Sequence, residues 1–89
     1  MNQKKPSRIG GGFDAMGKTI PLFRKHNADV HLKDMGMDNS EDRFRCIAMV
    51  AARLEHDDPY GAMEDATKYV DLTGAYRLLA VLLTGDKRD

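Results

Sequence analysis

The sequence predicts a mainly α-helical protein, a small three-helix bundle with helices at about 40–55, 59–71 and 74–84. Three observations predict this class. Apolar residues recur at helical spacing throughout the second half of the chain, residues that start or stop helices flank each segment, and only short turns separate the segments. Each apolar stripe has to be buried against another, so three such helices joined by short turns favour a bundle.

The first predicted helix begins at Ser40 and runs to about Glu55. The Ser40 hydroxyl can accept a hydrogen bond from a free backbone N–H group, and the acids at 41 and 42 favour the positive end of the helix dipole. Its apolar stripe consists of Phe44, Ile47, Ala48, Ala51 and Leu54. These positions form one face at helical spacing.

The second predicted helix opens with Asp58 before Pro59, the order of a capping residue and a first-turn proline. Its apolar stripe consists of Ala62, Met63, Ala66, Tyr69 and Val70. The third helix has Gly85 as its C-terminal stop. Its apolar stripe consists of Ala75, Leu78, Leu79, Leu82 and Leu83.

The third predicted helix is apolar almost all round, because residues 78–83 are all Leu, Ala or Val. Such a helix is either central in its own fold or covered by another chain. Two interpretations follow. A second copy or a different protein covers part of the helix, or the N-terminal segment of the same chain folds over it.

Residues 19–35 are predicted to form a short β-hairpin. Apolar residues alternate with polar ones on both sides of the stretch HNAD, which suits a turn; they are Ile20, Leu22, Val30 and Leu32. A helical interpretation of the same stretch pairs Phe23 with Val30 and has to start at Pro21, because proline is tolerated only in the first turn.

Charge divides the chain into segments of opposite sign: +5 over residues 1–25, −6 over residues 26–71 and +1 over the rest. The first 18 residues also hold three consecutive glycines and little apolar content, so burial cannot offset their ordering entropy. We therefore expect a flexible, basic, Gly-rich arm at 1–18 and a single small helical domain at 19–89. The arm either lies on the acidic body, reaches an anionic partner, or serves solubility alone.

The stretch GFDAMGKT fits the phosphate-loop pattern G-x-x-x-x-G-K-[ST], with Gly12, Gly17, Lys18 and Thr19 at its fixed positions. A true phosphate loop joins a buried strand to a helix, and a magnesium-binding Asp follows a later strand. The residues ahead of Gly12 make a poor buried strand, and no later strand ends in such an Asp. We therefore interpret the stretch as a Gly-rich hinge and expect no nucleotide binding.

Metal or catalytic chemistry is not predicted. The soft metal ligands are His26, His31, His56 and Cys46, and their spacings match no zinc pattern. One cysteine cannot form an internal disulfide, and Cys46 reads as a small packed residue. No pair of acids forms a persuasive catalytic set, so we expect no enzyme, no cofactor and no metal.

The sequence therefore favours a small protein-binding module, an adaptor, inhibitor or regulator that occupies a surface of a larger protein, or pairs with a second copy as a homodimer. The candidate partner-binding residues are Tyr76, Leu79, Leu83, Tyr60 and Tyr69. The longest apolar run is far shorter than the roughly 20 residues of a membrane-spanning helix, so we expect a cytoplasmic protein. Small helical chains of this style fit bacterial or phage accessory roles.

A second hypothesis is an accessory regulator that binds nucleic acid through the arm and the first predicted helix. The basic residues that would contact phosphates are Lys4, Lys5, Arg8, Arg43, Arg45 and Arg53. Affinity that falls steeply with salt would distinguish this hypothesis from a protein-binding module.

Overall fold

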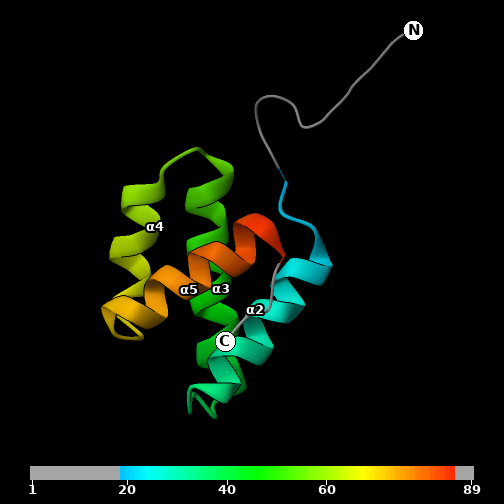
Figure 1. The fold of residues 1–89 in the computed structure, drawn as a ribbon, viewed down its shortest axis with the longest axis vertical. Coiled ribbons are helices and arrows are strands. Elements are labelled where there is room, and N and C mark those ends of the chain that lie inside the picture. Colours follow the sequence, from blue (N-terminus) through cyan, green and yellow to red (C-terminus); the bar gives the residue numbers. More distant parts are fainter. Residues whose placement is uncertain (1–18, 86–89) are drawn as a thin grey trace, which may run out of the picture.

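The computed structural model describes residues 19–85, which form four α-helices and no strand (Figure 1). The helices are α2 (Leu22–Asp34), α3 (Ser40–Glu55), α4 (Pro59–Ala66) and α5 (Leu72–Thr84). The mainly helical class is confirmed. The described part of the chain adds α2 to the three helices that the sequence predicts.

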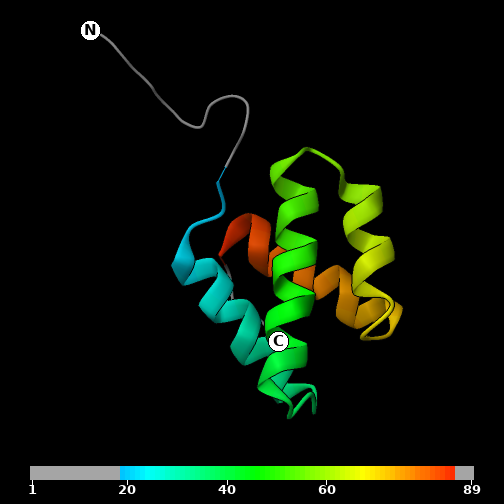
Figure 2. The same cartoon turned by 180° about the vertical axis from the view of Figure 1, so that it is seen from behind.

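The helices surround one apolar core. Helices α3 and α4 form an antiparallel pair, α5 crosses α3, and α2 lies beside α5 and α3 (Figures 1 and 2). The core consists of Ile20, Ala28, Leu32, Cys46, Ile47, Val50, Ala51, Leu54, Ala62, Ala66, Ala75, Leu78, Leu79, Val81 and Leu82. Seven of these fifteen residues come from α3 and α4, and five come from α5.

The predicted β-hairpin at 19–35 is wrong, because this stretch forms α2. Pro21 occupies the N-cap, so the helix starts where the helical interpretation requires. The buried residues of α2 are Ala28, His31 and Leu32, and Leu32 is the single large apolar side chain among them. This narrow face makes a weak helical signal in the sequence, and the alternation of apolar residues around it resembles a strand.

Helix α3 differs from its prediction in its cap and in its buried face. Asn39 is the N-cap, and its side-chain oxygen accepts from the Asp42 N–H at 3.0 Å. Phe44 is 72% exposed and Ala48 is also exposed, so the predicted stripe is wrong at these two positions. The buried face is therefore rotated about the helix axis relative to the predicted stripe. It consists of Arg43, Cys46, Ile47, Val50, Ala51 and Leu54.

The second and third predicted helices have different limits. Helix α4 ends at Ala66, and a turn replaces the predicted helical residues 67–70. Asp58 caps α4 as expected, with its Oδ1 accepting from the Gly61 N–H at 2.9 Å. Helix α5 begins two residues early, after Asp71, and ends at Gly85 as predicted, with Gly85 in the left-handed conformation at φ 79°.

Helix α2 covers one side of α5. Arg24 Nη1 donates to the Leu83 carbonyl at 3.0 Å, and Asn27 Nδ2 donates to the Gly85 carbonyl at 3.0 Å. These bonds satisfy carbonyls that the end of a helix leaves free, and the Arg24 charge favours the negative end of the dipole. The N-terminal segment thus folds over α5, as one of the two interpretations of this helix expects.

Candidate functional site

The outer face of α5 carries several exposed apolar residues. The buried residues of α5 share one side; they are Gly74, Ala75, Leu78, Leu79, Val81 and Leu82. The other side carries Leu72, Tyr76 and Leu83, which are 59%, 63% and 52% exposed, together with exposed Ala80. Their spacing aligns these four residues along one face of the helix. We call them the outer strip.

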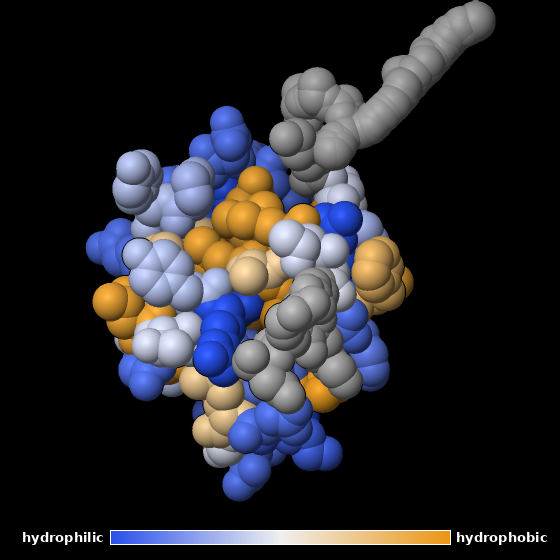
Figure 3. Space-filling model, in the orientation of Figure 1, coloured by the Kyte–Doolittle hydropathy of each residue, from blue (hydrophilic) through white to orange (hydrophobic). Residues whose placement is uncertain are grey.

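Figure 3 shows hydrophobic residues gathered over α5, near the centre of the face that also faces the viewer in Figure 1. Exposed polar residues of α5 flank the outer strip on one side; they are Thr73, Arg77 and Thr84. Buried Leu79 borders the strip on the other side, where α5 meets the remaining helices. The strip is therefore an uncovered continuation of the core face.

The five predicted partner-binding residues do not form one surface. Tyr76 and Leu83 belong to the outer strip, whereas Leu79 is only 8% exposed and packs in the core. Tyr60 is exposed on α4. Tyr69 is half-buried after α4, and its hydroxyl donates to Met49 Sδ at 3.8 Å.

Two residues of the outer strip, Leu72 and Ala80, are absent from the sequence-based set. Each lies four residues from Tyr76, so helical spacing places both on the face of Tyr76. Leu72 lies outside the predicted limits of the third helix, which begin at 74. Ala80 carries little apolar area, so its presence in the sequence does not indicate an interface.

Arg43, a candidate phosphate contact, is buried. Its Nε donates to Asp29 Oδ1 at 2.7 Å, and its Nη1 donates to the Met37 and Asp38 carbonyls at 2.7 and 3.0 Å. A guanidinium that is paired and hydrogen-bonded in this way can be withdrawn from water. Arg43 thus fastens α2 and the loop after it to α3.

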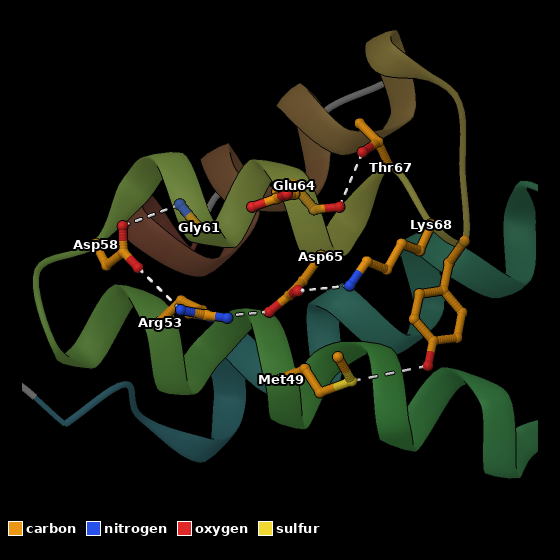
Figure 4. A network of polar contacts seen from close by, with 9 residues as sticks. Met49, Arg53, Asp58, Gly61, Glu64, Asp65, Thr67 and Lys68 are labelled. Atoms are coloured by element: carbon orange, nitrogen blue, oxygen red, sulfur yellow. Dashed lines mark hydrogen bonds and ion pairs between the residues drawn. The ribbon is translucent and has the colours of Figure 1, made fainter.

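Arg53 joins α3 to α4. Figure 4 shows its guanidinium between two acids: Nε donates to Asp65 Oδ2 at 3.0 Å and Nη1 to Asp58 Oδ2 at 3.2 Å. Lys68 Nζ lies 3.4 Å from Asp65 Oδ1. Burial favours a higher pKa for the Asp65 carboxyl, but the bonds and charges of Arg53 and Lys68 hold this pKa below its usual value. The hydrogen bond and charge of Asp65 raise the pKa of Arg53.

Arg45 and Arg77 are both exposed, but only Arg45 has an acidic partner among the described residues. Arg45 lies on α3 and its Nη1 is 3.7 Å from Asp42 Oδ1. Arg77 makes no hydrogen bond or ion pair with any residue between 19 and 85. Helix α5 carries no other charged residue. The one charge on this helix therefore flanks the outer strip and has no partner among the described residues.

A second surface feature is an open hollow of about 340 Å³ between the α2–α3 and α4–α5 connections. Its lining residues are Met35, Gly36, Met37, Tyr69, Val70 and Asp71. The polar side chains of this lining already have partners, since Asp71 Oδ1 accepts from the Gly74 N–H at 2.8 Å and Tyr69 contacts Met49. The hollow offers apolar contact and no free reactive group.

Cys46 is fully buried, and burial followed by the negative charge of Asp65 raises the pKa of its thiol to about 11. The thiolate is the reactive form of cysteine, so this thiol is inert at neutral pH in the folded protein. Between residues 19 and 85, no three His, Cys, Asp or Glu side chains gather closely enough to hold a metal ion. In the same region, no helix has the length and hydropathy to cross a membrane.

The phosphate-loop residues Gly12, Gly17 and Lys18 lie outside the described residues, and Thr19 is exposed at their edge. The basic arm residues Lys4, Lys5 and Arg8 also lie outside them. Comparison with known proteins adds no relative: no family model, curated protein or solved structure matches the chain.

Proposed function

We propose that the protein is a small non-enzymatic protein-binding module, an adaptor, inhibitor or regulator that binds its partner through the outer strip of α5. One observation carries the proposal. Helix α5 buries a complete core face and still carries Leu72, Tyr76, Ala80 and Leu83 on its other side, in water. Contiguous exposed apolar residues on a small domain commonly mark an interface.

The size of the strip sets the expected strength of binding. Full burial of a leucine contributes about 1.5–3 kcal/mol, and the large residues of the strip are already partly buried. Covering them would contribute roughly 1–2 kcal/mol each, before the cost of association. Tyrosine at the centre of a strip suits an interface hot spot. Further contacts around the strip are needed for tight binding.

The test is affinity capture of the tagged full chain from a lysate of its native host, followed by mass spectrometry. Wild-type protein should retain a stoichiometric protein that survives nuclease, and Leu83→Glu should lose it because a charge then lies in the strip. Phe44→Glu is the matched control, since Phe44 is an equally apolar exposed residue on α3. Helix content measured by circular dichroism should stay unchanged in both variants.

Equal capture by wild-type and Leu83→Glu protein would contradict the proposal. Loss of all captured material on nuclease treatment would favour the alternative, a regulator that binds nucleic acid through the basic arm. In that case neutralising Lys4, Lys5 and Arg8 should weaken capture, and affinity should fall steeply with salt. Arg43 and Arg53 already have acidic partners within the fold, so they weigh against phosphate binding by α3.

A further inference from the structure

Arg77 sets the outer strip apart from a purely apolar face. It follows Tyr76 and precedes Ala80 by three residues, so its long side chain lies on the flank of the strip near the middle. The other arginines of the described residues all have partners: Arg24 bonds α5 carbonyls, and Arg43, Arg45 and Arg53 pair with acids. Arg77 is exposed and has none between residues 19 and 85.

The position of Arg77 disfavours an antiparallel second copy as the occupant of the strip. In an antiparallel pair of α5 helices, placing Leu72 opposite Leu83 of the other copy brings the two Arg77 residues within one position of each other. A parallel two-fold pair places them at the same height but on opposite flanks of the strip. The antiparallel arrangement therefore places like charges together beside an apolar contact, which opposes association. A partner with a carboxylate at this position removes the conflict.

We infer that the outer strip receives an amphipathic helix of an acidic partner, whose apolar stripe packs on Leu72, Tyr76 and Leu83 and whose carboxylate pairs with Arg77. This inference rests on the proposed protein-binding function and names the chemistry of the partner. The small side chain of Ala80 leaves room between the larger residues, so a partner side chain can enter there as ridges pack into grooves.

The dimensions of the strip suit a helix. Leu83 lies eleven positions after Leu72, or roughly 16 Å along the axis, which matches about three turns of a partner helix. Apolar residues at i, i+3, i+4 and i+7 of such a helix form a stripe of this length. Paired arginine and carboxylate at the rim add specificity to the apolar contact more than they add affinity.

The test uses two capped helical peptides about 18 residues long, which share one leucine stripe and carry either glutamate or lysine on both flanks. Each is titrated into the 15N-labelled full chain by NMR. We expect shifts at the outer strip and roughly fivefold tighter binding of the glutamate peptide. Arg77→Glu should reverse this preference, and Arg45→Glu, a charge reversal at another exposed arginine, should leave it unchanged.

The outcomes separate the inference from the proposed function. The inference of an acidic helix is overturned if neither peptide binds, or if binding requires Leu83 but shows no charge preference. The proposed function would still be supported if the chain captures a native partner and Leu83→Glu abolishes that capture. Self-association of the unbound chain that requires Tyr76 and Leu83 would instead make a second copy the occupant. A preference that Arg45→Glu alters as much as Arg77→Glu reflects overall charge and also overturns the inference.

Discussion

Asp65 carries the electrostatic link between α3 and α4 at the level of single residues. Its carboxylate is almost fully buried, and Arg53 and Lys68 both contact it. Removing one partner of a largely buried charged hydrogen bond is costly, although Arg53 is half exposed and retains Asp58. Asp65→Asn should therefore lower the free energy of unfolding at pH 7 by about 1–2 kcal/mol.

The pKa of Asp65 gives this prediction a pH dependence. The folded pKa lies below the usual value of about 3.9, so the unfolded chain takes up the proton first on acidification. The contribution of Asp65 is complete above that value and disappears as pH falls through the folded pKa. Urea unfolding should show a wide gap between wild-type and Asp65→Asn protein at pH 7 and a narrower gap at pH 3.

Glu64→Gln is the control for this experiment, because Glu64 is the neighbouring exposed acid and only its backbone carbonyl is bonded, by the Thr67 hydroxyl (Figure 4). It should leave stability nearly unchanged at both pH values. A gap for Asp65→Asn that is the same at pH 3 and pH 7 would show that the charge of Asp65 does not stabilise the fold.

Some roles of single residues are predictable from the sequence, and others depend on contacts between distant residues. Cys46 is a packed residue as predicted, because a small apolar side chain on a helical stripe rarely has another role. Arg43 is a candidate phosphate contact in the sequence, but the fold buries it. Its partner Asp29 lies on another helix, fourteen residues away, and no local pattern indicates that pairing.

Gly61 in α4 is a helical glycine whose replacement by alanine we expect to destabilise the protein. Replacing a helical glycine with alanine usually stabilises a helix by about 1 kcal/mol. At Gly61 the added Cβ would overlap Asp58 Oδ2 and lie 3.1 Å from Arg53 Cδ, so the carboxylate that caps α4 has to move. Gly61→Ala should therefore lower the free energy of unfolding by about 1 kcal/mol, the usual contribution of an N-cap.

A double-mutant cycle tests this explanation by urea unfolding. Asp58→Ala removes both the cap and the overlap, so in that background Gly61→Ala should become neutral or stabilising. If Gly61→Ala destabilises both backgrounds equally, the Asp58 side chain is not the cause, and the cap of α4 contributes less than its geometry indicates.

The helices that could be predicted from the sequence are those with clear apolar periodicity or a clear start or stop residue. Helix α3 and the stop at Gly85 have clear apolar periodicity or a special backbone position, and both are confirmed. Helix α2 was assigned to a hairpin because it buries a single large apolar residue, Leu32, and is held by contacts with α5 that no local pattern contains. Helix α4 ends at Ala66 although residues 67–71 contain no Gly or Pro, so no local signal indicates this turn.

In the whole molecule, α5 carries more apolar residues than the other helices cover, and the outer strip is the uncovered part. The helix is apolar nearly all round, and α2 with the other helices covers only part of it. The sequence alone indicates that this helix has more apolar residues than one buried face needs, and it identifies two members of the strip, Tyr76 and Leu83. It placed Leu79 in the same set because the side that α2, α3 and α4 cover depends on the tertiary fold.

If the outer face of α5 is not needed for folding, Leu82→Ala and Leu83→Ala should differ in their effect on stability. The two leucines are adjacent on one helix, but Leu82 is 0% exposed and Leu83 is 52% exposed. Urea unfolding should show a loss of about 2–5 kcal/mol for Leu82→Ala and at most about 1 kcal/mol for Leu83→Ala. A loss at Leu83 equal to that at Leu82 would show that Leu83 belongs to the core and that the fold needs the outer face of α5.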